Sequence, residues 1–289
     1  MIADISDKSR AKILSEALPY IQKFNGKTIV IKYGGNAMVS QIMRDAVISD
    51  CLLLSLVGIH VVLVHGGGPE ISQMMKKTGK ESRFINGLRY TDDETVDLVQ
   101  MVLAGKVNKD LVASVNAAGG RAVGICGMDA NLLTCKKILD PDGTDYGYVG
   151  EVSRVNKKII DDLLQEKYIP VIATVACGED GHAYNVNADT AAAKIASSIH
   201  AEKMILLTDT KGVLKDKDDE STLISRIRTA EIDGFIRDGF IQGGMIPKIK
   251  CCRTAVEEGV KTAHILDGRV EHSVLIEVFT DQGIGTMIY

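Results

Sequence analysis

Short apolar runs alternate with amphipathic stretches along almost the whole chain, and this alternation limits the possible folds more than any other feature. The runs Thr28–Lys32, His60–Val64 and Ile169–Val175 have the length and the β-branched residues of strands. When strands alternate with helices, the strands form a mostly parallel sheet with helices on both faces. We therefore predict an α/β fold, a three-layer sandwich around a mostly parallel central sheet.

The same patterns place the remaining elements. Further strands are expected at Ala122–Cys126, Tyr148–Val155 (as part of an extended hairpin), Met204–Leu207, Thr262–Leu266 and Thr286–Ile288, the last as an edge strand. Helices are expected at Arg44–Val57, Ile71–Lys77, Leu98–Ala118, Lys157–Glu166, Asp189–Ile199, Thr229–Arg237, Ile246–Glu258 and Val274–Phe279.

An amphipathic helix precedes this alternating region. Its apolar residues recur at helical spacing: Ile13, Leu14, Ala17, Leu18, Ile21 and Phe24. Pro19 should kink the helix, and Gly26 is a suitable end for it. Two interpretations stay open, a helix packed on its own domain and an oligomerisation arm. We predict three parts: the helix in residues 1–26, an N-lobe in residues 27–200 and a C-lobe in residues 201–289.

Composition argues against several classes of protein. The formal net charge is -4, without a long basic block, which disfavours nucleic acid as a partner. No apolar run approaches the ~20 residues that a membrane helix needs, and the N-terminus lacks the apolar core of a secretion signal. The six cysteines form no CxxC pair, so we expect reduced, mostly buried thiols and no metal site. These features predict a cytoplasmic protein, or one of the plastid stroma if a transit peptide has been removed.

Three glycine clusters, two of which carry a lysine, indicate the chemistry. They are Lys32-Tyr-Gly-Gly35, His65-Gly-Gly-Gly68 and Gly243-Gly-Met-Ile-Pro-Lys248. Glycine clusters leave backbone N–H groups free to converge on an anion, and lysine adds a positive charge. The first two clusters follow strands, at the sheet edge where ligands bind in such folds. Glycines after strands also occur in plain turns, but three clusters together predict a bound polyphosphate and phosphoryl transfer.

None of the common nucleotide motifs accounts for these clusters. The chain has no GxxxxGK[ST], no GxGxxG followed by an acid at the right distance, and no HRD or DFG signature. We therefore expect phosphate to be bound by another scheme.

Two further segments carry polar side chains suited to a binding site. In Asn185-Val-Asn-Ala-Asp189, the residues at alternating positions face the same side of an extended segment, so they can converge on one pocket. An aspartate between two lysines would hold both by charge-assisted hydrogen bonds. Arg89, in an apolar and turn-rich stretch, could grip a carboxylate bidentately. The alternatives are a helix cap for the first segment and a surface arginine for the second.

Together these segments resemble the amino-acid kinase superfamily, and within it the N-acetylglutamate kinase family. The matching segments appear in the family's order and span nearly the whole chain: Ile29–Gly35, His65–Glu70, Asn86–Thr91, Asn185–Asp189, Leu206–Gly212 and Gly243–Lys248. The resemblance implies ATP-dependent phosphorylation of the γ-carboxylate of N-acetyl-L-glutamate, the second step of arginine biosynthesis. It places the amino-acid substrate in the N-lobe and the nucleotide in the C-lobe.

The resemblance also implies a role for each matching residue. Lys32 and Lys248 would flank the transferring phosphoryl group, and Asp189 would position both lysines. Arg89 and Asn185 would bind the α-carboxylate of the substrate, while Gly34, Gly35, Gly66 and Gly67 would supply backbone N–H groups to the phosphates. The nucleotide site would comprise Gly34, Gly35, Thr208, Asp209, Lys211, Gly212, Gly243, Gly244 and Met245. A substrate carboxylate is already ionised at pH 7, so direct in-line attack needs no general base, and Mg²⁺ should arrive on the ATP phosphates.

Both ends of the chain resemble the arginine-sensitive, hexameric branch of this family. That resemblance implies a trimer of dimers joined by the N-terminal helices, with L-arginine as inhibitor bound near Tyr20, Lys203, Glu277 and Gly283. The alternative is a plain dimer. Some relatives also bind the PII signalling protein, which makes PII a possible partner.

Three other functions fit the sequence less well. Another carboxylate or carbamate kinase of the superfamily would keep the glycine–lysine scheme. A non-catalytic arginine sensor would be expected to lose Lys32, Lys248 or Asp189, and all three are present. An NAD-dependent oxidoreductase is disfavoured because the GxGxxG motif is missing.

Overall fold

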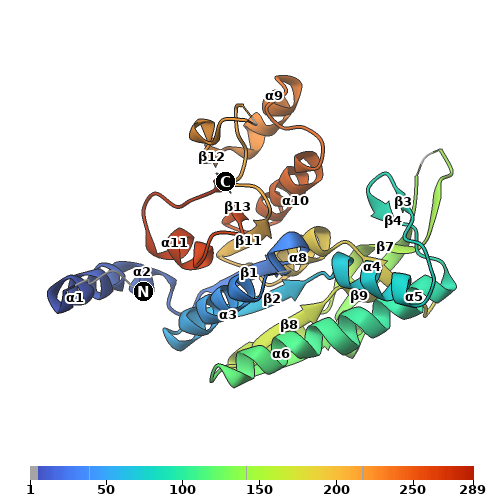
Figure 1. Cartoon of the computed structure of the whole chain (residues 1–289), viewed down its shortest axis with the longest axis horizontal. Coiled ribbons are helices and arrows are strands. Elements are labelled where there is room, and N and C mark those ends of the chain that lie inside the picture. Colours follow the sequence, from blue (N-terminus) through green and yellow to red (C-terminus); the bar gives the residue numbers. More distant parts are fainter. Residues whose placement is uncertain (1–5, 39, 141, 217) are drawn as a thin grey trace.

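The computed structural model describes residues 6–38, 40–140, 142–216 and 218–289 (Figure 1). Within these residues, eight strands form one sheet in the order β12–β14–β13–β11–β1–β2–β8–β5. Neighbouring strands are parallel except for β13 and β14, which confirms the predicted mostly parallel sheet. The bounds are β1 Thr28–Tyr33, β2 His60–His65, β5 Ala122–Cys126, β8 Ile169–Ala173, β11 Lys203–Thr208, β12 Arg226–Ile227, β13 Thr262–Asp267 and β14 Thr286–Ile288.

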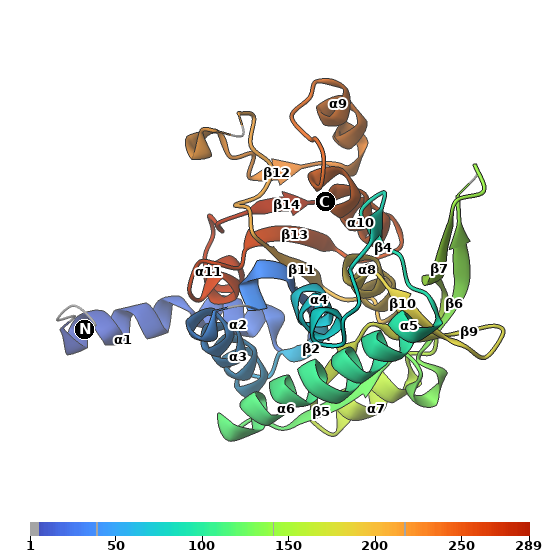
Figure 2. The same cartoon turned by 45° about the vertical axis from the view of Figure 1, so that its right-hand side comes forward.

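Helices cover both faces of this sheet, as predicted (Figure 2). Side chains alternate along each strand, so Val30 joins one core while Ile29 and Ile31 join the other. The core of Val30 includes residues of α7 Lys158–Gln165, α8 Ala188–Ser198, α9 Ile232–Arg237 and α10 Met245–Glu257. The opposite core includes residues of α2 Leu18–Phe24, α3 Gln41–Leu56, α4 Gly68–Lys77, α5 Asp93–Gln100, the π-helix η2 Met101–Val107, α6 Asn108–Ala117 and α11 Ser273–Phe279.

A second, smaller sheet stands beside the carboxyl ends of the central strands (Figure 2). It closes on itself in the order β10–β7–β6–β9, and a separate two-stranded hairpin, β3–β4, lies near it. The bounds are β3 Phe84–Ile85, β4 Leu88–Arg89, β6 Leu133–Leu139, β7 Asp145–Val155, β9 Val175–Gly178 and β10 Ala183–Val186. Short 3₁₀ turns complete the described elements: η1 Gly35–Met38, η3 Asp129–Asn131, η4 Glu220–Thr222 and η5 Thr229–Glu231.

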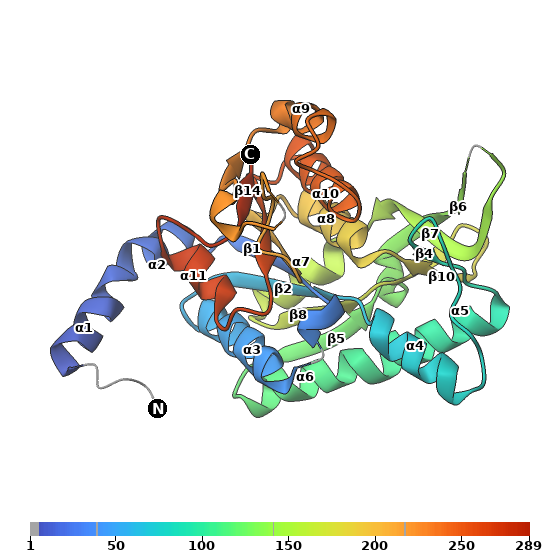
Figure 3. The same ribbon diagram turned by 45° about the horizontal axis from the view of Figure 1, so that its top comes forward.

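The N-terminal helix is broken into α1 Asp7–Glu16 and α2, with Pro19 in the first turn of α2, so the predicted kink is confirmed. Helix α2 packs on the body through Phe24, which is buried. Helix α1 points away from the rest of the molecule, and none of its residues is buried (Figure 3). The interpretation of a helix packed on its own domain therefore holds for α2 and is wrong for α1. Residues 1–5 of the predicted arm lie outside the described residues.

Three details of the predicted elements are wrong. Strand β14 is not at the edge, because Arg226–Ile227 pairs along its outer side. The single strand expected at Ile169–Val175 breaks at Thr174 into β8 and β9, which belong to different sheets. The helix expected from Leu98 starts earlier, at Asp93, and its middle is π-helical. The boundary between lobes near residue 200 stays a prediction.

Candidate active site

The alternation of side chains on β1 places Lys32 at the site. Lys32 is two residues beyond Val30, so its side chain points to the sheet face that α8 and α10 cover. The strand is central, with β2 and β11 as its neighbours. A buried central strand is a rigid support, and Lys32 is only 8% exposed.

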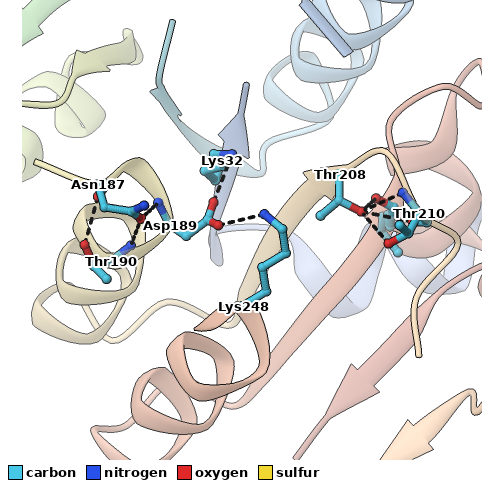
Figure 4. Close-up of polar contacts among 8 residues, drawn as sticks. Lys32, Asn187, Asp189, Thr190, Thr208, Thr210 and Lys248 are labelled. Carbon is cyan, nitrogen blue, oxygen red and sulfur yellow. Dashed lines mark hydrogen bonds and ion pairs between the residues drawn. The ribbon is translucent and has the colours of Figure 1, made fainter. Parts of the chain in front are cut away.

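One buried carboxylate joins two lysines from different elements (Figure 4). Lys248, in the first turn of α10, donates a hydrogen bond to Asp189 Oδ2 at 2.8 Å. Lys32 Nζ lies 2.9 Å from Asp189 Oδ1 and forms an ion pair with it, although the angles between the two groups are not those of a hydrogen bond. Asp189 is itself fixed in the first turn of α8, because the side chain of Asn187 caps that helix by accepting from the N–H groups of Asp189 and Thr190. The structure therefore brings together the three residues predicted to be catalytic.

The charges of this triad depend on one another. Burial alone would raise the pKa of Asp189, but the positive charges of Lys32 and Lys248 lower it to about 2. The carboxylate is thus ionised at neutral pH. Two ammonium groups around one carboxylate leave a net positive charge, which suits an anionic ligand.

A cavity of about 510 Å³ opens beside the triad. Its wall includes all three of these side chains together with both β-strand glycine clusters and the β3–β4 hairpin. Of the residues predicted to bind substrate or phosphate, the following line it: Gly34, Gly35, Gly66, Gly67, Arg89 and Asn185.

The glycines of the two clusters serve different purposes. A Cβ on Gly34 would lie 3.1 Å from Lys32 Nζ, so glycine lets the lysine side chain pass close to the backbone. A Cβ on Gly67 would lie 2.6 Å from Leu103 Cδ2 of the π-helix. The prediction of a free N–H at Gly66 is wrong, because this group donates to the backbone oxygen of Tyr33 at 3.1 Å. The N–H of Gly66 is thus taken up by the pairing of β1 with β2 and is not free for a ligand.

Arg89 also lines the cavity and is buried, so the alternative of a surface arginine is wrong. Its guanidinium donates to Ser82 Oγ at 2.7 Å, Ser72 Oγ at 2.8 Å and the Gly68 carbonyl at 3.0 Å. It also stacks over the ring of Phe84 at 4.7 Å. Burial lowers the pKa of Arg89, and no acidic side chain of the described chain pairs with it. A buried cation without an anionic partner favours a negatively charged ligand.

Asn185 lies on β10 and lines the same cavity as the triad and Arg89. Its Nδ2 donates to Thr91 Oγ1 at 3.3 Å, and the side chain lines the cavity. Asn185, Asn187 and Asp189 all line the cavity, and Asn187 also caps α8, so the predicted convergence on one pocket is confirmed and the alternative of a helix cap alone is wrong.

Gly34 and Gly35 line this cavity, but the other residues predicted to bind nucleotide lie outside it, at the same edge of the sheet. Leu206 of β11 pairs with Lys32 in register, so Thr208 follows beyond it at the strand's carboxyl end (Figure 4). Thr208 Oγ1 donates to Leu266 O at 3.2 Å, and Lys211 pairs with Glu220 at 2.5 Å. Among the other predicted members, Gly243, Gly244 and Met245 lead into α10 and so into Lys248, and Asp209 and Gly212 follow Thr208. Their predicted contact with nucleotide stays a prediction.

A second cavity, of about 590 Å³, contains all four residues predicted for arginine, namely Tyr20, Lys203, Glu277 and Gly283. His264 joins two of them: Lys203 Nζ lies 3.0 Å from its Nε2, and Glu277 Oε1 lies 2.7 Å from its Nδ1. Burial lowers the pKa of His264. This cavity is lined by α2, α11 and β11 and not by the triad.

Several functional residues had no clear signal in the sequence. Ser72 and Ser82 hold Arg89, yet isolated serines in polar segments are common. Asn108 is fully buried and reaches three strands, and only its place in an otherwise apolar helix face could have indicated it. The thiols match expectation: all six cysteines are free, and five of them are buried. Burial raises the pKa of Cys251 and Cys135 to about 12, so these two groups stay protonated.

The α/β fold, with its glycine clusters and two lysines on one aspartate, is that of a class of small-molecule kinases. Residues 27–267 match the sequence pattern of the amino acid kinase family, and the chain belongs to that family. It is 56% identical over 286 residues to the acetylglutamate kinase of Brachyspira hyodysenteriae, covering 99% of each chain. Acetylglutamate kinase of Clostridium beijerinckii is 55% identical over 286 residues, with 99% of this chain and 100% of the relative covered.

A solved structure extends the comparison to a related enzyme. N-acetylglutamate synthase from Neisseria gonorrhoeae, complexed with coenzyme A and L-arginine, superposes with a TM-score of 0.80 at 26% identity. The match covers 96% of this chain and 65% of the synthase, so this chain spans less than two thirds of that protein. No helix in the described part of the chain is long and apolar enough to cross a membrane.

Proposed function

We propose that this chain transfers the γ-phosphoryl group of ATP to the γ-carboxylate of N-acetyl-L-glutamate, giving the acyl phosphate of arginine biosynthesis. The observation that carries the proposal is the pair of lysines held on one buried aspartate, in a cavity that a buried arginine also lines. The acetylglutamate kinases that are 53–56% identical to this chain support the choice of acceptor.

The reaction needs charge stabilisation and positioning more than proton transfer. The acceptor carboxylate is ionised at neutral pH and attacks the γ-phosphorus directly, so the bond to the leaving ADP oxygen breaks as the new P–O bond forms. Lys32 and Lys248 reach the transferring group from two different elements, and their charges neutralise the oxygens of the transition state. Asp189 keeps both ammonium groups in place between turnovers.

The arginine in this cavity selects the acceptor. In this proposal the guanidinium of Arg89 pairs with the α-carboxylate of N-acetyl-L-glutamate, and Asn185 donates or accepts a hydrogen bond beside it. The guanidinium is held in place by Ser72, Ser82 and the ring of Phe84, so its positive charge is oriented for pairing with a carboxylate. An acceptor with carboxylates at both ends would thus span the cavity from Arg89 to the lysines.

ATP is proposed to arrive as its magnesium complex. No group of three His, Cys, Asp or Glu side chains in the described residues could hold a metal ion, and both oxygens of Asp189 are engaged by lysines. This arrangement fits a cation that enters on the phosphates, where Mg²⁺ keeps most of its waters. The adenine and ribose would then lie over the loops that follow β11 and precede α10.

Trapping of the product tests this proposal. Hydroxylamine converts an acyl phosphate into a stable hydroxamate, so the purified chain with MgATP and N-acetyl-L-glutamate should form hydroxamate continuously. Glutamate, aspartate and carbamate, offered in turn, should give far less. Hydroxamate with carbamate or aspartate instead would assign the chain to another kinase of the same fold.

A regulatory role is proposed for the second cavity. It places cations of Lys23, Lys203 and Arg226 near the carboxylates of Glu277 and Asp281, which is the charge pattern that an amino acid with a cationic side chain requires. The related synthase was crystallised with L-arginine, which supports arginine as the ligand. L-arginine should therefore inhibit the hydroxamate reaction, and titration calorimetry should detect its binding to the wild-type chain but not to Glu277→Ala.

Oligomerisation is proposed to involve α1. Ile13 and Leu14 of α1 and Leu18 at the start of α2 are 55%, 74% and 51% exposed, an apolar surface that the same segment of a second copy would cover. A hexamer built as a trimer of dimers is the expected assembly. Binding of the PII signalling protein stays a prediction, which co-purification with PII would test.

A further inference from the structure

His65 ends strand β2 directly before the glycine cluster, and it is fully buried on the sheet face opposite to the catalytic triad. Its ring makes two hydrogen bonds. Nδ1 lies 2.8 Å from the carbonyl oxygen of Gly66, and Nε2 lies 3.1 Å from Nδ2 of Asn108. The mechanism proposed above does not use this side chain.

The neighbours of the ring determine its tautomer. A carbonyl oxygen only accepts, so Nδ1 must carry the proton that bonds to Gly66. The Asn108 amide is oriented by its other partners, because Nδ2 donates to the Val171 carbonyl at 2.8 Å while Oδ1 accepts from Lys109. Nε2 of His65 therefore accepts from Asn108. Burial lowers the pKa of His65 to about 4, so the ring is neutral at pH 7.

This hydrogen bond fixes a peptide group that faces the cavity. Gly66 is held on both sides, since its N–H donates to Tyr33 O and its carbonyl accepts from His65. The described chain has no cis peptide bond, and in a trans peptide the N–H points opposite to the carbonyl. With the Gly66 carbonyl directed at the buried ring, the N–H of Gly67 is directed away from it, toward the cavity that both glycines line.

We propose that His65, held by Asn108, is a positioning residue whose Nδ1–H group orients the Gly66–Gly67 peptide so that the Gly67 N–H points at the transferring phosphoryl group. This inference rests on the proposed function for the identity of that group. The π-helix closes the arrangement from outside: Leu103 contacts Gly67, and Asn108 follows immediately after the last π-helical residue. The glycine loop is thus packed between the buried ring of His65 and the π-helix η2. Segments of π-helix often mark functional sites.

Two isosteric substitutions separate positioning from packing. The amide nitrogen of His65→Asn can occupy the place of Nδ1 and keep the bond to Gly66. The longer His65→Gln places its amide near Nε2 and loses that bond. His60→Asn, at the amino end of the same strand and away from the cavity, is the matched control.

Steady-state kinetics of hydroxamate formation give the first readout. Loss of one oriented N–H donor should lower kcat about 100-fold in His65→Gln, with the KM values for both substrates changed by less than about threefold. His65→Asn should stay within about tenfold of wild-type kcat, and His60→Asn should equal the wild type. A folded His65→Gln with wild-type kcat, or equal losses in the Gln and Asn variants, would overturn the proposal.

Nitrogen NMR of histidine-labelled wild-type protein gives a readout that is independent of activity. One ring should carry its proton on Nδ1 with a bare Nε2, and the signal should disappear in His65→Asn. A His65 ring protonated on Nε2 would overturn the assignment even if the chain is an active kinase. Absence of hydroxamate in the wild type would refute the proposed function instead and leave the tautomer test standing.

Discussion

Replacing Asp189 by asparagine removes the negative charge that joins the two lysines. The side chains of Asp189 and Lys32 are only 12% and 10% exposed, and that of Lys248 is 25% exposed, so solvent screens the triad weakly. Lowering the pKa of Asp189 from 3.8 to about 2 corresponds to roughly 2–3 kcal/mol of stability at neutral pH. We therefore expect Asp189→Asn to lower the free energy of unfolding by about 2–3 kcal/mol.

The pH dependence of this effect has a definite sign. Because the pKa of Asp189 is lower in the folded chain, its contribution is present above about pH 5 and is lost as the pH falls toward 2. Urea unfolding of the wild type and the variant should therefore differ most near neutral pH and converge in acid. Asp233→Asn is the matched control, since Asp233 also pairs with a cation but is 71% exposed, and its loss should cost less than about 0.5 kcal/mol.

MgATP should affect the variant differently from the wild type. Without Asp189 the two lysines have no counter-charge, and the phosphates of ATP supply one, so MgATP should stabilise the variant at least as much as it stabilises the wild type. The kcat should nevertheless fall at least about 100-fold, because the lysines are no longer held in position. A variant as stable as the wild type at pH 7, or one that loses ATP binding in parallel with kcat, would refute the reasoning.

Two further changes test the acceptor end and the assembly. Arg89→Lys keeps the charge but loses the planar guanidinium that Ser72 and Ser82 orient, so the KM for N-acetyl-L-glutamate should rise at least about tenfold with a smaller change in kcat. The control Arg83→Lys changes an exposed arginine and should leave both constants unchanged. A normal KM in Arg89→Lys would remove Arg89 from the acceptor site. Deleting residues 1–26 removes α1 together with Tyr20 and Phe24 of the second cavity. Light scattering should then show an assembly with fewer subunits, and inhibition by arginine should weaken. An unchanged number of subunits and an unchanged arginine response would contradict both roles.

The central sheet and the triad could be predicted because their signals are local. Apolar runs of strand length followed by glycine mark the carboxyl ends of β1 and β2, and strand alternation fixes the face on which Lys32 lies. The two-residue spacing of Asn185, Asn187 and Asp189 already implied convergence on one pocket, and all three line the cavity while Asn187 also caps α8.

What could not be predicted depends on contacts between distant segments. Strand β12 has only two residues and forms only because β14 offers a partner, so the edge of the sheet was misplaced. In the closed sheet, the pairing of β10 with β7 and that of β6 with β9 also join segments that are distant in the sequence. The N–H of Gly66 is taken by Tyr33, and which glycine N–H remains for a ligand is decided by pairing between strands and not by composition.

The central claim is that Lys32 and Lys248 act on the transferring phosphoryl group and not on substrate binding. Steady-state kinetics of Lys32→Ala and Lys248→Ala, with MgATP and N-acetyl-L-glutamate each varied, test it most directly. The account predicts that kcat falls at least about 100-fold in each variant while both KM values change by less than about threefold. A rise in KM with kcat unchanged would contradict it and would assign the lysines to ground-state binding.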